Sequence, residues 1–501
     1  MNLLNYLSER LAGSSAYARS DARLSRRKLL AGAAALLGVG NAPTRAAPPA
    51  SNTRWLVNRL TMGWSPEEQL LADTLGYHGY LEYHLNDGAI DDSSAIARIQ
   101  PYFGLFLQPY QSFGYNSAMI RHHLFMGTLI RAVYSKRQLF ERMVEFWTDH
   151  FSIDITKAED AWLKIIDDRD VIRAHALGNF RDLVQASAKS PAMLVYLDNA
   201  TSMVGNPNEN YARELMELHT LGVSGGYTQQ DVVEVARCFT GWSVDDQGMF
   251  DNPNKGKFVF QTQWHDYTEK TVLGQTIPAG GGIQDAQAVV DILCAHPSTA
   301  IFIATKLCKR FYGYSPPGSL VQSVADAYTA TGGDIKSMLR ALFNNVDPAT
   351  APQKLKRPIH HFVTAFRTTG AELTSNPNEF NTPIGLPFQA SGHDPFRWLT
   401  PDGYPDSLAA WSGLILPRWN FCASLMQNEI VGATVDLSAF LAGASTAQQV
   451  ADRIDGAIFG GVMNPADKSR IRDYMLPDLP SDQAKREAIG LALSSPGYQW
   501  Y

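Results

Sequence analysis

Hydrophobic side chains recur at three- and four-residue steps through most of the chain, which is the period of amphipathic helices. The segment 136–150 shows the pattern well, because Leu139, Met143, Phe146 and Trp147 fall on one stripe. The charged residues of that segment lie away from the stripe, so we expect one buried face and one polar face. Similar periodicity over 52–134, 159–199, 285–369 and 407–501 predicts a mainly α-helical fold.

The best-specified stretch runs from Asn206 to Trp242. Asn206 is a suitable helix cap, with Pro207 at the first helical position and Glu209 at the third. Gly222 ends that predicted helix, because glycine adopts the left-handed conformation at little cost. A second helix is expected to begin after Thr228, whose partner in a capping box is three residues further on.

The first of these two helices is predicted to have a polar arc and an apolar arc. Its arginine can pair with carboxylates four residues away on either side. Two interpretations stay open: a solvated, ion-paired surface, or a carboxylate cluster that lines a cleft with the arginine fixing its geometry. The polar arc consists of Glu209, Asn210, Arg213, Glu214 and Glu217.

The pattern changes after Trp242. Short apolar runs around an Asn/Pro/Gly turn predict a β-hairpin, and 271–274 is expected to add a short strand, so a small β insertion occupies about 245–275. Residues 374–407 carry six prolines and form a loop too long to be a simple connector, which favours a functional role. We therefore expect a large multi-helix globular domain over 47–501.

Several motifs of the chain resemble one bacterial family. They are the run Asn208–Leu218 with Leu221-Gly222-Val223 and Thr240-Gly241-Trp242, the upstream block Gln138–Met143, and His265-Asp266 further on. Together they are similar to the family catalogued as domain of unknown function 1800. The resemblance covers most of the chain after the N-terminal segment. The resemblance implies a common fold and export from the cytoplasm, and it implies no activity.

The N-terminal segment, residues 1–46, has the layout of a targeting signal. Arg26-Arg27 precedes a short apolar run from Leu29 to Val39, and Thr44-Arg45-Ala46 supplies small residues for cleavage. This order resembles a twin-arginine signal, which addresses folded proteins to the twin-arginine export machinery. We expect a periplasmic or otherwise extracytoplasmic protein. The run is too short to cross a bilayer, and no other run is long enough for a transmembrane span.

The net charge and the cysteine spacing limit which partners and metals the protein is expected to bind. The full chain carries 43 Lys+Arg and 49 Asp+Glu. The first 46 residues hold seven of the bases and two of the acids, which leaves 36 bases, 47 acids and a net charge of −11. So acidic a chain argues against nucleic acid as a partner. The four cysteines have no metal-ligand spacing and are expected to be buried, with a Cys294–Cys308 disulfide as the alternative.

Candidate chemistry centres on carboxylates and on three His–Asp neighbours. These are Asp149-His150, His265-Asp266 and His393-Asp394, of which the second is favoured because it lies in a loop within the family motifs. Each histidine can instead cap a helix or satisfy a turn. Paired carboxylates are what glycoside hydrolysis requires. Aromatic rings that can stack on sugars fall in or beside loops, at Trp242, Trp264, Trp398, Tyr404 and Trp411.

Signatures of serine hydrolases, nucleotide-binding enzymes, Rossmann dehydrogenases and zincins are missing. Two hypotheses remain. The first is an exported hydrolase acting on envelope glycans, and the second is a non-catalytic scaffold or binding protein for another exported protein or an envelope polymer. The sequence names no metal and no cofactor. The predicted catalytic residues are Glu214 or Glu217 as acid or base, Arg213 as their orienting partner, and His265 with Asp266 as the opposite wall. The predicted substrate contacts are Glu209, Asn210, Trp242 and Trp264.

Overall fold

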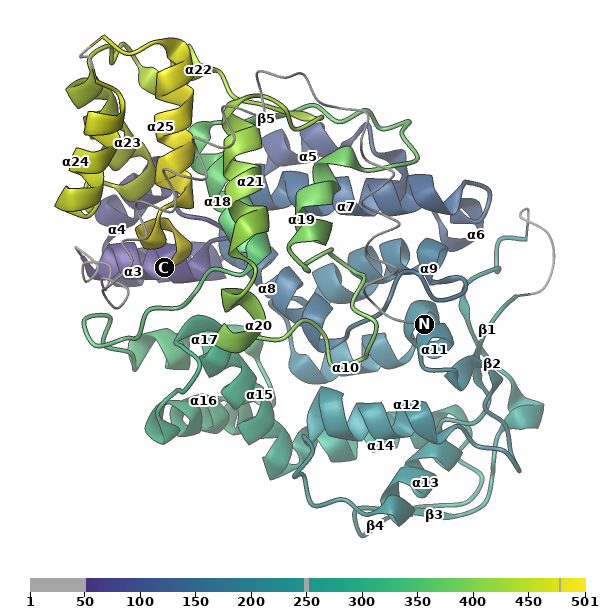
Figure 1. Ribbon diagram of the computed structural model, residues 1–501. Helices are drawn as coiled ribbons and strands as arrows, with labels where there is room; N and C mark the ends of the chain where they lie inside the picture. Colours follow the sequence, from purple (N-terminus) through teal and green to yellow (C-terminus); the bar gives the residue numbers. More distant parts are fainter. Residues whose placement is uncertain (1–50, 247–251, 477–478) are drawn as a thin grey trace.

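The computed structural model describes residues 51–246, 252–476 and 479–501, and the predicted signal at 1–46 lies outside this part. The described chain is mainly α-helical, as expected, with only small antiparallel strand pairs (Figure 1). The first half contains α3 Asn52–Leu60, α4 Pro66–Leu85, α5 Ser93–Ile99, α6 Pro109–Ser112, α7 Ser117–Tyr134, α8 Gln138–His150, α9 Asp160–Asp167, α10 Phe180–Ala188, α11 Pro191–Tyr196, α12 Glu209–Glu214 and α13 Gln229–Cys238.

The second half is again helical, and its last helices return to pack beside the first ones (Figure 1). The chain end lies next to α3 in that view. The elements are α14 Ile283–Ala295, α15 Pro297–Phe311, α16 Gly318–Thr331, α17 Ile335–Asn344, α18 Pro358–Thr369, α19 Leu386–Ala390, α20 Leu408–Ser412, α21 Ile415–Met426, α22 Leu437–Leu441, α23 Ala447–Phe459, α24 Pro465–Tyr474 and α25 Asp482–Ser494.

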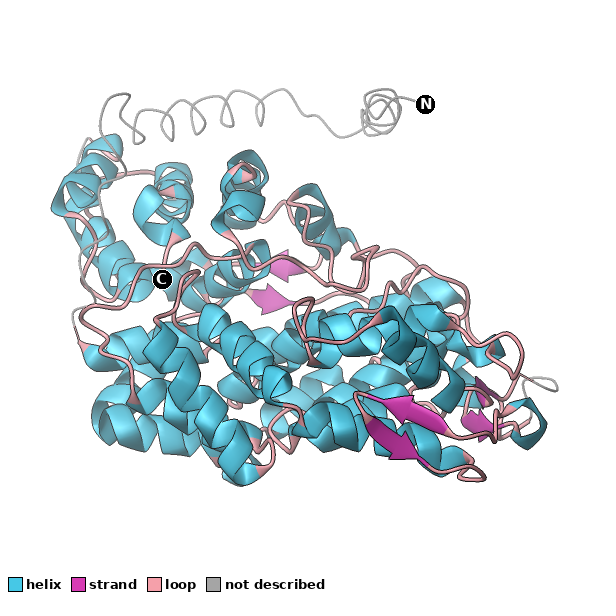
Figure 2. Cartoon of the chain, turned by 90° about the horizontal axis from the view of Figure 1, so that it is seen from below, coloured by secondary structure: helices cyan, strands magenta, loops and turns pink. Residues whose placement is uncertain are grey.

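Three two-stranded antiparallel pairs interrupt the helices, and two of them lie together at one end of the body (Figure 2). The predicted insertion is present, but its first strand is β1 Trp242–Val244, which pairs with β2 Phe258–Phe260. Met249 and Phe250, expected in that strand, lie outside the described residues. The second hairpin joins β3 Lys270–Val272 to β4 Gln275–Ile277. A third pair joins β5 Glu372–Leu373 to β6 Ala433–Thr434.

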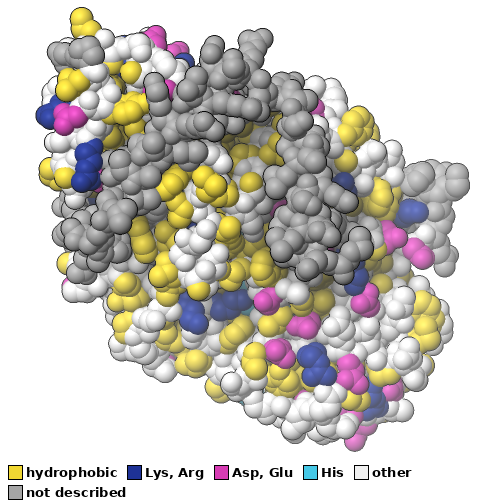
Figure 3. Space-filling model, viewed as in Figure 1, with side chains coloured by type: hydrophobic (Ala, Val, Ile, Leu, Met, Phe, Trp, Pro, Cys, Tyr) yellow, Lys and Arg dark blue, Asp and Glu magenta, His cyan; other side chains and the backbone are white. Residues whose placement is uncertain are grey.

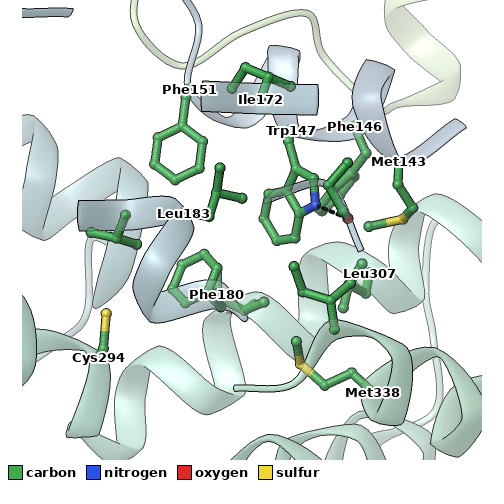
Figure 4. Packing of buried hydrophobic residues seen from close by; sticks show 14 of the residues in the cluster. Met143, Phe146, Trp147, Phe151, Ile172, Phe180, Leu183, Cys294, Leu307 and Met338 are labelled. Atoms are coloured by element: carbon green, nitrogen blue, oxygen red, sulfur yellow. Dashed lines mark hydrogen bonds between the residues drawn. The ribbon is translucent and has the colours of Figure 1, made fainter. Parts of the chain in front are cut away.

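Two large apolar clusters form the interior. One is built from α3, α4, α8 and the helices α10 to α17, and the other from α5, α7, α9, α18, α19 and the helices α21 to α25. In the first, Trp147 of α8 is fully buried and packs against Phe180, while its indole N–H donates to the Ala176 carbonyl at 3.0 Å (Figure 4). Truncating such a side chain typically costs about 3–5 kcal/mol.

Helix α8 differs from its prediction on one face. Its apolar stripe is buried as expected, but Glu141 and Arg142 on the other side are buried too, at 5% and 0% exposure. The reason is that helices of the second apolar cluster meet α8: α7 packs against it, and His360 of α18 contacts Arg142 and Glu145. The helix therefore lies between the two clusters, and its acids must find partners inside the protein.

The family-motif helix begins two residues later than predicted. Asn208, and not Asn206, caps α12, because its side chain accepts from the N–H groups of Asn210 and Tyr211. The next six residues, Leu215–Thr220 (η5), form a π-helix, and a second π-helix spans Asp168–Arg173 (η3). Such turns are uncommon and frequently occur at functional sites. The capping box predicted at Thr228 is confirmed for α13.

Two expectations about composition are tested within the described residues. All four cysteines are free and buried, so Cys294 and Cys308 are separate thiols rather than a disulfide. Burial raises the pKa of both thiols to about 12. No single described helix is long and apolar enough to span a bilayer, although α14 and α15, bent by 66° at their junction, together reach that length and composition.

Candidate functional site

A layer of buried charges fills the seam between the two apolar clusters. Its centre is Glu145 and Asp149, one turn apart on the inner face of α8. Arg357, just before α18, donates to Glu145 at 2.8 Å and to Asp149 at 2.6 Å. Arg310 of α15 donates to the same two carboxylates at 3.2 and 2.8 Å. Two guanidinium groups thus neutralise two carboxylates, which is the condition for holding such charges away from water.

The electrostatics of this layer keep its acid ionised and its histidine neutral. Burial opposes ionisation of Glu145, but the His360 contact and the charges of Arg310 and Arg357 outweigh it and hold the pKa of Glu145 well below its ordinary value. His360 Nε2 lies 2.7 Å from Glu145. Burial and the charge of Arg142 lower the pKa of His360 to about 3. The layer is a structural ion-pair network that orders the segment above it.

That segment is the loop 392–406, part of the long loop that the sequence singles out. Gly403 lies directly on the end of α8, where an added Cβ would be 1.9 Å from the Asp149 carbonyl oxygen. The Ile155 N–H donates to the Phe396 carbonyl at 2.9 Å, and the Tyr196 hydroxyl donates to the Leu399 carbonyl at 3.0 Å. These contacts fix the loop on the segment after α8 and on α11.

An open cleft of about 570 Å³ lies along this loop. Its walls combine carboxylates, hydroxyl groups, one guanidinium and aromatic rings. The rings of Trp398 and Tyr404 are 5.0 Å apart, and the Trp398 indole N–H donates to Asp402 at 2.8 Å. The lining residues are Asp154, Thr156, Gln389, Gly392, Asp394, Arg397, Trp398, Leu399, Thr400 and Tyr404.

Asp394 stands between this cleft and a second hollow of about 290 Å³. Gln389, Asp394 and Arg397 line both hollows, so the two share a wall. Arg397 donates to Asp394 at 3.1 Å, yet burial outweighs that contact and raises the pKa of the Asp394 carboxyl. A carboxyl group in this position holds its proton longer than an exposed aspartate does.

A small cavity beneath the loop connects the cleft residues to the charged layer. It has a volume of about 40 Å³ and is bordered by Glu145, Asp149, His393 and Tyr404. His393 packs on the Tyr404 ring at 4.4 Å, and its Nε2 lies 3.4 Å from Arg357. Its Nδ1 is buried with no protein partner. The cavity is lined mainly by apolar surface, and it is large enough to hold a water molecule.

The polar arc of the family motif lies on the surface of α12 and its π-helical continuation. Asn210 is exposed, whereas Glu209, Arg213, Glu214 and Glu217 are half-buried. Arg213 lies 3.5 Å from Glu209 but donates to Gln229 rather than pairing with Glu217. Glu217 instead accepts from the Tyr227 hydroxyl at 3.1 Å. In Figure 3, acidic and basic side chains intermingle on the part of the surface formed by α12.

Glu214 is the member of this arc with perturbed titration. Burial, then the neighbouring charge of Glu217, raises the pKa of its carboxyl, and Asp402 of the cleft loop adds to the effect. Glu214 therefore lies within electrostatic reach of the cleft loop.

The predicted opposite wall has other partners. His265 is buried, with Nδ1 2.7 Å from the Thr240 carbonyl and Nε2 3.2 Å from Asp285. Arg237 donates to Asp266 at 2.8 Å, and despite partial burial this contact and others hold the pKa of Asp266 well below its usual value. Within the described chain, no hydrogen bond or ion pair joins His265 or Asp266 to the glutamates of α12.

The two predicted tryptophans differ in exposure. Trp242 is fully buried between Phe239 and Phe258, so it presents no ring face to solvent. Trp264 is half-buried, and its carbonyl accepts from the Val204 N–H at 2.7 Å. The described residues hold no group of three or more His, Cys, Asp or Glu side chains arranged for a metal ion.

Two of the three His–Asp neighbours do converge, and they are the two that sequence reasoning ranked lower. Asp149 and His393 border the same small cavity and contact the same arginine, Arg357. The signal available in the sequence was the proline-rich loop 374–407, which carries His393. Asp154 was missed, because a single aspartate after a helix has no distinguishing pattern.

Fold and site together define a helical protein in which a buried charged layer supports a loop-walled cleft. The chain belongs to a family described as "Protein of unknown function (DUF1800)", whose model matches residues 55–500. This match confirms the resemblance given by the motifs. No curated protein and no solved structure matches the chain.

Proposed function

We propose that the protein is an exported hydrolase of envelope glycans and that its site is the cleft along the loop 392–406. The observation that carries the proposal is the place of Asp394, a partly buried carboxyl group between two adjoining hollows. A polymer lying across both hollows would pass its chain over Asp394. An enzyme that cleaves a polymer within its chain needs binding sites on both sides of its catalytic group, and the two hollows would supply them.

Asp394 is the proton donor in this proposal. Glycoside hydrolysis needs one carboxylic acid that is still protonated at working pH and one carboxylate that acts on the sugar ring. The raised pKa of Asp394 suits the first role, because the acid protonates the leaving glycosidic oxygen.

Asp154 is the second carboxylate, since it lines the same cleft. Its Oδ1 accepts from the Thr156 N–H at 2.9 Å, and the Thr156 hydroxyl lies 2.8 Å from both carboxylate oxygens. These hydrogen bonds fix the orientation of the carboxylate. In the proposed reaction Asp154 attacks the anomeric carbon or activates the water that does so.

The aromatic wall supports a carbohydrate rather than a charged peptide. Trp398 is half-buried in the wall of the cleft, and Tyr404 lies beside it. The indole N–H of Trp398 donates to Asp402, and this hydrogen bond holds the ring in one orientation. Flat rings of this kind stack on the apolar faces of sugars.

The export part of the proposal rests on the sequence of residues 1–46. Changing Arg26 and Arg27 together to lysine should retain the precursor in the cytoplasm, because the export receptor reads the arginine pair. Fractionation followed by immunoblotting measures this. Export of the double variant at the wild-type level would remove this part of the proposal.

The catalytic part is tested by incubating the purified protein with envelope glycans and measuring new reducing ends. We expect release by the wild type, and loss of release by at least about 100-fold in Asp394→Asn, the range for removing a general acid. Asp91→Asn is a matched control, because that carboxylate is exposed. Binding of glycan without release by the wild type would overturn the hydrolase assignment and favour a binding protein.

A further inference from the structure

A lysine on α15 is joined to two histidines near the cleft loop, in a group that the glycan proposal does not use. Lys306 Nζ lies 2.9 Å from Nδ1 of His150, the last residue of α8. His150 Nε2 lies 3.0 Å from the main-chain carbonyl of His219. Three elements, α8, α15 and η5, thus contribute one residue each.

The backbone of η5 explains why this carbonyl is available. The π-helical hydrogen bonds end here, with the Leu221 N–H donating to the Met216 carbonyl at 2.8 Å. The His219 carbonyl lies at the end of the helical segment, where carbonyl groups lack partners within the helix. It therefore accepts from the His150 ring. Gly222, just after η5, packs against Phe302 of α15, which brings this end beside Lys306.

These contacts fix the tautomer of His150. A main-chain carbonyl only accepts, so Nε2 carries the hydrogen and Nδ1 offers its lone pair to Lys306. Burial and the nearby charge of Lys306 lower the pKa of His150 well below its usual value, so the ring is neutral. Lys306 donates one hydrogen to it. In the amine form of Lys306, the nitrogen lone pair then points away from the histidine and is available to a ligand.

The surroundings increase the fraction of Lys306 in the amine form. Burial lowers the pKa of Lys306 to about 8, and Arg310 opposes its charge while Asp149, Asp402 and Asp406 support it. His150 and His219, the other titratable groups nearby, are neutral, since burial lowers the pKa of His219 to about 3. Lys306 itself is partly exposed, and both histidines are buried.

A second observation points to a missing partner. His219 Nε2 is buried and has no hydrogen-bond partner in the protein. Its side chain is 1% exposed and lies within electrostatic reach of Lys306. Buried polar atoms are nearly always paired, so this nitrogen is expected to bind a ligand or a water molecule.

We propose that Lys306, held by His150 and His219, is a nucleophilic amine that condenses with a small aldehyde or ketone. The amine nitrogen adds to the carbonyl carbon and releases one proton, and the carbonyl oxygen takes up a proton. The resulting carbinolamine then loses hydroxide as water after a second protonation, which leaves a protonated imine. Asp402, at the tip of the cleft loop, is the nearby carboxylate that can relay these protons. Desolvated lysines are the usual amines for this chemistry.

The test uses the purified full-length protein with glycolaldehyde and sodium cyanoborohydride, which reduces an imine to a stable secondary amine. Peptide mapping by mass spectrometry locates the labelled lysines. Lys309 is the matched control, because it is on the same helix, one turn away, and exposed. At pH 7 we expect Lys306 to be labelled about tenfold faster than Lys309, after allowing for the lower nucleophilicity of a less basic amine.

The pH dependence of labelling distinguishes a reactive amine at Lys306 from a lysine that is labelled only because it is accessible to solvent. Labelling of Lys306 should level off above about pH 8. Asp402→Asn should slow labelling of Lys306 and leave Lys309 unchanged. Equal rates at the two lysines, or labelling of Lys309 alone, would overturn the proposal. The result is independent of glycan hydrolysis, because labelling is read on the protein itself.

Discussion

Gly403 is the position at which the cleft loop can be displaced with a single methyl group. The residue has φ of +73°, in the left-handed region. A Cβ there would lie 1.9 Å from the Asp149 carbonyl oxygen and 2.8 Å from its carbon. Because Cβ contacts under 3.0 Å do not occur in practice, Gly403→Ala forces the loop to move from α8 by at least about 1.1 Å.

The cost has two parts. Placing alanine in the left-handed region costs roughly 1–2 kcal/mol. Strain from overpacking against the main chain of α8 adds typically 1–3 kcal/mol. We therefore expect the free energy of unfolding to fall by about 3 kcal/mol. Unfolding entropy near 2.1 cal/mol/K per residue over roughly 440 described residues converts this to a fall in Tm of about 3 °C.

Differential scanning calorimetry of the purified protein measures the change. The matched control is Gly413→Ala, since Gly413 has φ of −83° and nothing within 4 Å of an added Cβ. That variant should change the Tm by less than about 0.5 °C, because an unstrained surface substitution stays within about 0.5 kcal/mol. If the two variants unfold at the same temperature, the close contact between the loop and α8 does not exist as described.

Three further predictions concern the charged layer, the proposed acid and the predicted wall. Glu145→Gln should destabilise the protein by about 3–5 kcal/mol in urea unfolding, because it leaves buried guanidinium groups uncompensated; Glu82→Gln, in an exposed ion pair, should cost less than about 1 kcal/mol. The raised pKa of Asp394 stabilises the fold at low pH, and this contribution is lost as pH rises from about 4 through the folded-state pKa. Asp394→Asn should abolish that part of the slope of unfolding free energy above about pH 4, and an unchanged slope would contradict the assignment. His265→Gln should lower stability in urea but leave glycan binding in isothermal titration calorimetry intact. A loss of binding at unchanged stability would support the site predicted from the sequence, in which His265 and Asp266 face the substrate.

The helical class could be predicted from the sequence because it depends on local information. The apolar stripe of α8 and the capping box at Thr228 each depend on residues within two turns of each other. The start of α12 was misplaced by two residues, since Asn206 and Asn208 are both suitable caps. The choice between them depends on tertiary contacts: the Asn208 N–H donates to Ser202 and its side chain donates to the Asp198 carbonyl.

The cleft could not be predicted for the opposite reason, because it is made from distant segments. The sequence around Glu145 does not indicate that Arg310 and Arg357 contact this carboxylate, because both arginines lie far away along the chain. Periodicity assigns the polar side of α8 to solvent, and only the packing of a second apolar cluster places it inside. The segment 374–407 was singled out by length and proline content, but the structure places α19 within the predicted loop, and the contacts of the loop with Asp149 and Tyr196 come from the fold.

The most direct test of the proposed cleft compares two tryptophan variants for binding to an envelope glycan by isothermal titration calorimetry. Trp398 lines the cleft, whereas Trp264 was the substrate contact expected from the sequence. We predict that Trp398→Ala weakens binding by at least tenfold, about 1.4 kcal/mol, within the range of losing one stacked ring, and that Trp264→Ala leaves it unchanged. Loss of binding in Trp264→Ala with full binding in Trp398→Ala would contradict the account and return the site to the face of α12.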